Sequence, residues 1–235
     1  PPTHPELLDW LAVELMEPTA SGTKPWSMKA IHRLILTSSA YRMRSSTREV
    51  DATARAIDPT NRWYWHFPVT RMEAEDVRDG LLFVAGALDT ARGGPDIDYG
   101  QGLTSRRRSL YFTHHGEARM PFLEIFDAPD ACDAYKRSSS VVPQQALALS
   151  NSRLVQDCTK LIAARFGADV SPGDDPAFVR KAFRGVLGFA PQEAELAASV
   201  ETMEAWRKIP DTTPDQARAH FVWALLNHND FVTMR

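Results

Sequence analysis

Apolar residues recur at intervals of three and four along most of the chain, which is the spacing of amphipathic helices. The pattern is clearest in the segment 71–88, which we predict to form one helix. Its core-facing positions would be Ala74, Val77, Leu81, Val84 and Leu88. The opposite face would carry Arg71, Glu75 and Arg78 as an exposed ladder of charges.

Further helices are predicted where a capping residue or a proline precedes an apolar stripe. Two of them lie near the N-terminus, one from Pro5 to about Met16 and one from Ser27 to about Ser38. A long helix should begin at Pro143 and close near Gly167. In the last third, three helix starts are marked by Asp175-Pro176, Ala190-Pro191 and Thr213-Pro214.

The remaining segments lack this period. Residues 42–70 are predicted to be an extended connection, apart from a short helix-like run around Ala52–Ala56. The aromatic run Trp63–Phe67 within it would fill a core. The best strand candidate is Ser109–Thr113. In sum, we predict an all-α or nearly all-α fold of about eight helices with one short β element. We expect residues 1–235 to form a single helical domain, with a sub-division into 1–140 and 141–235 left open.

Composition excludes several classes of protein. The chain has 235 residues and a formal net charge of −3, so no overall basic character suggests a nucleic-acid partner. No apolar run reaches the roughly 18 residues that a membrane span requires. Cys132 and Cys158 are the only cysteines and form no C-x-x-C or C-x-x-C-H motif, so we predict neither a structural zinc site nor a haem attachment site in this chain. Whether the two cysteines pair is left open.

Candidate chemistry concentrates between residues 107 and 137, where polar side chains must either pair with one another or serve a partner. The candidate ligand- or partner-binding residues are Arg107, Arg108, His114, His115, Asp127 and Arg137. In the structural interpretation, Arg107 or Arg108 pairs with Asp127. In the functional one, a guanidinium remains available for an oxyanion. Adjacent histidines on a strand point to opposite faces, so we predict no metal site there.

No catalytic motif with a recognisable spacing occurs in the chain. The carboxylates that could act as general acid and base are Glu73, Glu75, Asp76, Glu124, Asp127 and Asp130, and no spacing singles out a pair. We therefore leave catalytic residues unassigned and favour a protein that is not an enzyme. A hydrolase or lyase acting on an anionic polysaccharide is the alternative.

Blocks spread along nearly the whole chain resemble the C-terminal domain, of unknown function, of planctomycete-type, cytochrome-associated multidomain proteins. The blocks include residues 2–12, 26–35, 58–62, 71–79, 107–111, 122–130, 142–149 and 224–231. The resemblance implies a parent chain with an export signal, a c-type cytochrome module and a second helical domain. It also implies an extracytoplasmic setting, in the periplasm or at the cell surface, and haem only in the upstream domains.

The chain opens at Pro1 without a methionine, and we expect the domain to begin upstream of it. The function that combines these points is a helical module that docks with, or scaffolds, the cytochrome and substrate-binding domains of its own parent chain. Its expected partners are those domains, with an anionic polysaccharide as the alternative ligand.

Overall fold

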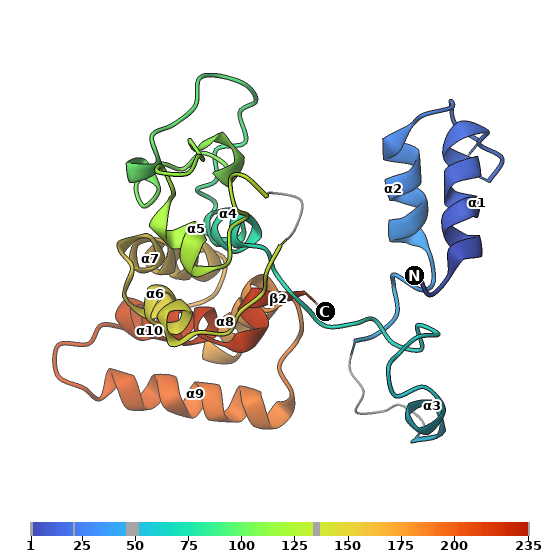
Figure 1. Ribbon diagram of the computed structural model, residues 1–235. Helices are drawn as coiled ribbons and strands as arrows, with labels where there is room; N and C mark the ends of the chain where they lie inside the picture. Colours follow the sequence, from blue (N-terminus) through green and yellow to red (C-terminus); the bar gives the residue numbers. More distant parts are fainter. Residues whose placement is uncertain (1, 21, 46–51, 134–136, 235) are drawn as a thin grey trace. The chain divides into compact units, whose positions relative to one another are not determined.

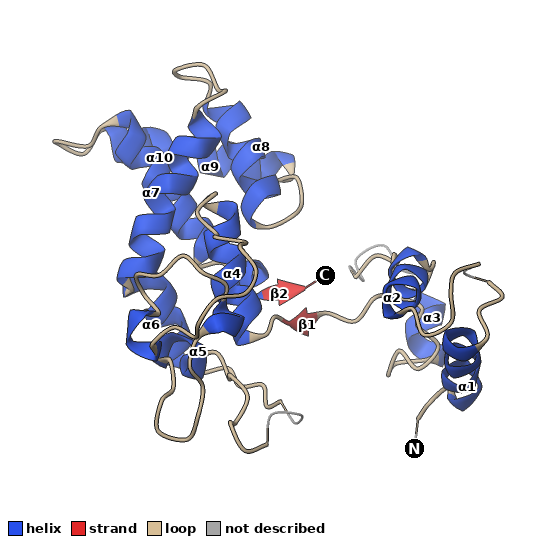
Figure 2. Cartoon of the chain, turned by 90° about the horizontal axis from the view of Figure 1, so that it is seen from above, coloured by secondary structure: helices blue, strands red, loops and turns tan. Residues whose placement is uncertain are grey.

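The computed structural model describes residues 2–20, 22–45, 52–133 and 137–234, and helices dominate this part of the chain (Figure 2). The α-helices are α1 (Pro5–Met16), α2 (Met28–Thr37), α3 (Ala52–Ile57), α4 (Ala74–Val84), α5 (Pro121–Ile125), α6 (Pro143–Asn151), α7 (Arg153–Gly167), α8 (Asp175–Val186), α9 (Glu193–Arg207) and α10 (Pro214–Leu226). Three 3₁₀ turns, η1 (Tyr99–Gln101), η2 (Ser109–Tyr111) and η3 (Asn229–Val232), accompany them. A two-stranded sheet pairs β1 (Thr70–Arg71) with β2 (Thr233–Met234). Helices, including the 3₁₀ turns, hold 53% of the described residues, which confirms the nearly all-α prediction.

The chain divides into two compact units. The first unit comprises residues 1–70 with 234–235, and the second comprises residues 71–233. The boundary between these units lies between Thr70 and Arg71, whereas the sequence had suggested a sub-division at residue 140.

The core of the second unit surrounds the helix pair α7 and α10, which lie side by side (Figure 1). Helix α10 also packs on α8 and α9, while α7 contacts α4, α6 and α8. Fully buried core side chains of these helices include Leu81, Val155, Ile162, Phe178, Val222 and Leu226. Every member of the connected core cluster lies in the second unit.

Most predicted helix starts are confirmed. The Ser27 hydroxyl accepts a hydrogen bond from the Ala30 amide at the start of α2. Pro176 and Pro214 lie in the first turns of α8 and α10, while Pro191 precedes the residue that caps α9. The single long helix expected from Pro143 is wrong, because Ser152 adopts an extended conformation and separates α6 from α7. Its hydroxyl accepts from the Val155 amide at 3.4 Å and so starts a new helix.

Helix α4 confirms the predicted stripe and corrects the predicted charged face. Ala74, Val77 and Leu81 are fully buried, and Val84 packs against the core. Arg78 is also fully buried, so it does not belong to an exposed ladder. The helix is shorter than predicted and ends at Val84.

The strand predicted at 109–113 is wrong. Ser109–Tyr111 forms the turn η2, and Phe112 makes only an isolated bridge to Ile97. The carboxylate of Asp79 accepts hydrogen bonds from both the amide and the hydroxyl of Ser109. The Ser109 amide is therefore not available to pair with the carbonyl oxygen of a neighbouring strand.

The first unit contains α1, α2, α3 and a folded loop over residues 58–67. The Asp58 carboxylate accepts from the Arg62 and Trp63 amides at 2.9 and 2.7 Å, and Asn61 holds the backbone of His66. Helix α3 confirms the helix-like run predicted around Ala52–Ala56, whereas residues 58–67 fold into a compact loop instead of an extended connection. Residues 46–51 of the predicted connection lie outside the described residues. The expectation that the aromatic run fills a core is also wrong, because Trp63 is 68% exposed.

Candidate functional site

The buried guanidinium of Arg78 holds the loop that leads to the candidate residues Arg107 and Arg108. Its nitrogens donate to the carbonyl oxygens of Gly102, Ser105 and Arg107 at 3.0, 2.6 and 2.9 Å. The ring of Phe112 lies 4.7 Å from the guanidinium carbon. Burial lowers the pKa of Arg78, and the neighbouring Asp79 carboxylate partly opposes this effect. The charge is thus used inside the fold to hold residues 102–107 against α4.

Arg107 closes a second loop onto the same region. Its terminal nitrogens donate to the carbonyl oxygens of Ala91 and Gly93 at 2.8 and 2.6 Å. The guanidinium carbon lies 4.1 Å from the centre of the Tyr111 ring, and Nη1 lies 3.7 Å from the Asp89 carboxylate. Arg107 therefore links residues 89–93 to η2 through its hydrogen bonds and its contact with the Tyr111 ring.

The predicted pairing of Arg107 or Arg108 with Asp127 is wrong. Arg108 lies 3.6 Å from the Asp79 carboxylate instead. Asp127 adopts a left-handed conformation with φ 62° and accepts from the amide and the hydroxyl of Ser140, both at 2.7 Å. The first contact joins Arg108 to α4 and the second joins Asp127 to Ser140, so neither links η2 to α5 in the way that the sequence suggested.

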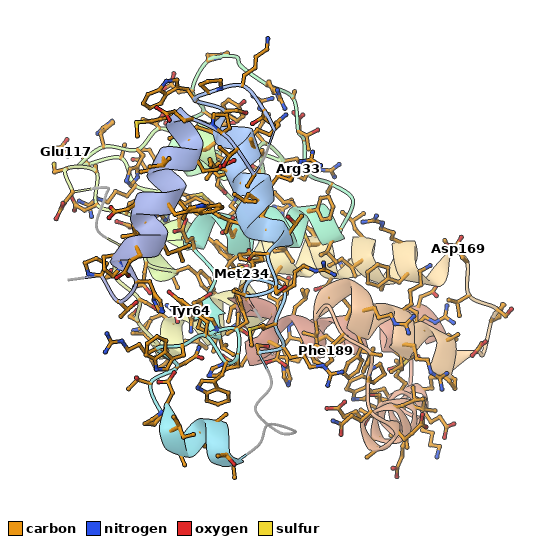
Figure 3. The ribbon with its side chains drawn as sticks, turned by 90° about the vertical axis from the view of Figure 1, so that its right-hand side faces the viewer. Arg33, Tyr64, Glu117, Asp169, Phe189 and Met234 are labelled. Atoms are coloured by element: carbon orange, nitrogen blue, oxygen red, sulfur yellow. The ribbon has the colours of Figure 1, made fainter. Side chains whose placement is uncertain are left out.

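The two histidines, His114 and His115, make different contacts. His114 is exposed, and its Nε2 lies 2.9 Å from the Pro129 carbonyl oxygen. His115 is exposed and pairs through its backbone with Ala118. Glu117 lies on the same outward loop (Figure 3). Across the described ranges, no group of three or more His, Cys, Asp or Glu side chains could hold a metal ion.

Arg137 pairs with the start of α4. Its terminal nitrogens lie 2.7 Å from Glu75 and 3.4 Å from Glu73. The hydrogen bond to Glu75 raises the pKa of Arg137. Two carboxylates that the sequence had offered for catalysis are thereby engaged in one ion-pair network.

Arg119 engages two further carboxylates of that pool. It lies 3.2 Å from Asp130 and 3.7 Å from Glu124. The hydrogen bond from the Cys132 amide, followed by the charge of Arg119, lowers the pKa of Asp130. The charged side chains described in the segment 107–137 are thus mainly engaged in contacts within the fold.

A feature that the sequence prediction missed lies between α7 and α10. An open cavity of about 970 Å³ is lined by residues of both helices, among them Lys160, Ala164, Arg218, His220 and Trp223. Arg218 was not a sequence candidate, because it follows Ala217 in an apolar stripe and no motif surrounds it. Its place in a cavity depends on residues of α7, which are distant from Arg218 in the sequence.

Helix α1 shows a second feature that the sequence did not predict. Five of its large apolar side chains are exposed, Leu7, Leu8, Trp10, Val13 and Met16, and we call this set the α1 apolar surface. The residue of α1 that is buried is Glu14, whose carboxylate accepts from the Thr19 and Ala20 amides at 2.9 and 3.0 Å. Leu11 and Leu15 are half-buried, so α1 has apolar residues on both its sheltered and its exposed sides. Within the described residues, no helix is long and apolar enough to cross a membrane.

Comparison with known proteins places the chain in a family. The family model described as PSD1, protein of unknown function (DUF1553), matches residues 1–203. No curated protein and no solved structure matches the chain. The match covers most of the two compact units described above. The chain therefore belongs to the PSD1 (DUF1553) family of proteins of unknown function.

Proposed function

We propose that the chain is a non-catalytic helical module that docks onto another domain of its parent protein through the α1 apolar surface. The observation that carries this proposal is the exposure of that surface, with Leu8 53% and Val13 50% exposed. Large exposed apolar patches of this kind mark interaction sites on soluble proteins.

The positions of these residues extend the argument. Successive helical residues are separated by about 100°, so Leu8 and Val13 project in different directions from α1. One neighbouring helix covers only one side of such a helix. Because α2 is the helix that packs against α1 in the first unit, the remaining apolar positions need another cover.

The partner that we propose is the c-type cytochrome module of the parent protein, in an extracytoplasmic setting. The support for this partner is the family resemblance of the sequence blocks. In this proposal the haem belongs to the partner and this chain holds none. A Soret absorption band in the purified chain would contradict that part of the proposal.

The polysaccharide hydrolase has less support. Four carboxylates of its proposed pool are engaged with Arg119 or Arg137. Among the described residues that line the α7–α10 cavity, Asp215 is the one carboxylate, whereas a general acid and base of the usual kind need two.

Binding of residues 1–235 to the separately expressed cytochrome module tests the docking proposal. Leu8→Glu should weaken the association about tenfold or more, because it places a charge in an apolar contact. Val141→Glu is the matched control, since Val141 is 85% exposed in the second unit. This control should bind as the unmodified chain does.

Three outcomes would overturn the proposal. The first is equal binding by Leu8→Glu and the unmodified chain, and the second is no binding by the unmodified chain. The third is a large fall in the melting temperature of the isolated Leu8→Glu chain, which would mean that α1 is covered within the chain itself.

A further inference from the structure

The guanidinium of Arg218 is buried without a hydrogen-bonding partner. Arg218 is 9% exposed, and within the described part of the chain no hydrogen bond or ion pair engages it. Its Nε is enclosed and unsatisfied. A buried arginine normally uses several of its five N–H donors, because an unpaired buried charge is costly. Arg78 in the same unit shows the usual arrangement, with three carbonyl acceptors.

Two contacts explain how the charge is tolerated without satisfying it. The ring of Phe178 lies 4.9 Å from the guanidinium carbon, which is a cation–π distance. The guanidinium also lies beside Gly167, at the C-terminal end of α7, where the helix dipole favours a cation. Neither contact is a hydrogen bond, so the donors on the two terminal nitrogens of Arg218 remain available for a ligand.

The surroundings of Arg218 define which ligand fits. Arg218 lines the cavity of about 970 Å³ between α7 and α10, a volume in the upper range of small-molecule sites. Lys160 and His220 line the same cavity, and Asp215 is the one acidic residue of its described lining. The basic groups therefore favour an anion.

The walls of the cavity are mainly apolar and made of small residues. Ala163, Ala164 and Ala168 line it from α7 and the residue that follows, and Ala219 and Trp223 line it from α10. Small side chains leave the space open, and the indole ring offers a flat apolar surface. Gly167 belongs to this arrangement, because a methyl group there would lie 3.1 Å from Nη1 of Arg218.

We propose that the α7–α10 cavity binds a small amphipathic anion, with a carboxylate or phosphate head group on Arg218 and an apolar body against the alanine-rich walls. A planar guanidinium can donate two parallel hydrogen bonds to either head group. This site lies within the second unit and is independent of docking through α1.

Calorimetric titration of residues 1–235 with four eight-carbon probes tests the site. Octanoate and octyl phosphate carry the two head groups, 1-octanol is the neutral probe and octylammonium is the cationic one. At least one anionic probe should bind about tenfold or more tightly than the neutral and cationic probes, since charged hydrogen bonds are the stronger ones. The tighter of the two anions identifies the head group.

Variants then locate the binding. Arg218→Gln should weaken binding of the preferred anion about tenfold or more, because the charged donor is lost. Arg184→Gln, an exposed position on α8, is the matched control and should bind like the unmodified chain. Ala164→Phe narrows the cavity without altering Arg218 and should also weaken binding. It keeps the test decisive if Arg218→Gln does not fold, which circular dichroism reports.

Three results would overturn the proposal. The first is equal affinity for octanoate, octyl phosphate and 1-octanol, which would make the cavity merely apolar. The second is unchanged binding by folded Arg218→Gln or by Ala164→Phe. The third is no heat of binding for either anion at millimolar concentration.

Discussion

Arginine side chains hold several loops of the second unit in place, and they do so largely through hydrogen bonds to the backbone. Arg78 and Arg107 donate mainly to backbone carbonyl oxygens of loops. A guanidinium suits this role because its donors point in several fixed directions and it stays charged. Arg218 departs from this pattern, and that difference makes it the residue of greatest functional interest.

Replacing Arg78 by Met should destabilise the chain by about 3 kcal/mol, since three carbonyl oxygens would lose the donor that the buried guanidinium provides. Urea denaturation measures the change. Arg106→Met is the control at an exposed position of the same loop, and it should stay within about 0.5 kcal/mol of the unmodified chain. Equal stability of the two variants would contradict the role given to Arg78.

The two cysteines should differ sharply in reactivity, because both are free and only Cys132 is exposed. Burial raises the pKa of the Cys158 thiol to about 11, with the nearby Asp157 adding to the effect. At pH 8 about one part in a thousand of Cys158 is thiolate, the form that reacts with alkylating reagents. Iodoacetamide should therefore label Cys132 first, and peptide mass spectrometry should find Cys158 labelled only after denaturation. Equal labelling of both in the folded chain would refute this.

At the scale of elements, the helices of the second unit each bury apolar residues, and α4 adds an acidic first turn. Burial, followed by repulsion from Glu73 and Glu75, raises the pKa of Asp76. An acid with a raised pKa in the fold is less favourable in its charged form. Asp76 therefore lowers the stability of the fold at neutral pH. This cost disappears as the pH falls below the pKa that Asp76 has in the unfolded chain.

Asp76→Asn should consequently raise the stability of the chain at pH 7 and leave it nearly unchanged at pH 3, below the ordinary aspartate value of 3.8. Denaturation at the two pH values measures the difference. Glu117→Gln, at an exposed loop position, is the control and should show little change at either pH. A loss of stability for Asp76→Asn at pH 7 would show that the charged form of Asp76 is favourable in the fold.

At the scale of the whole molecule, the second unit holds the connected core while the first exposes much of its apolar surface. A fragment of residues 70–234 should therefore keep its helices and a cooperative thermal transition, because all residues of the core cluster remain. Far-UV circular dichroism with melting tests this. Loss of the cooperative transition would mean that the first unit is needed for folding.

The sequence by itself determined the nearly all-α class, the α4 stripe and most helix starts. These features depend on residues within about four positions of one another, so spacing and capping residues are sufficient. The break between α6 and α7 is also local, but its signal, a single serine, is common in helices and elsewhere.

Only the tertiary structure decided which charges are buried and with what they pair. The three carbonyl acceptors of Arg78 lie 24 to 29 positions away in sequence, and no periodicity connects them. Asp127 bonds to Ser140 rather than to Arg108 because the path of the loops, not the residue types, sets the distance. The α7–α10 cavity arises in the same way, since small residues distant in sequence meet only when the two helices pack.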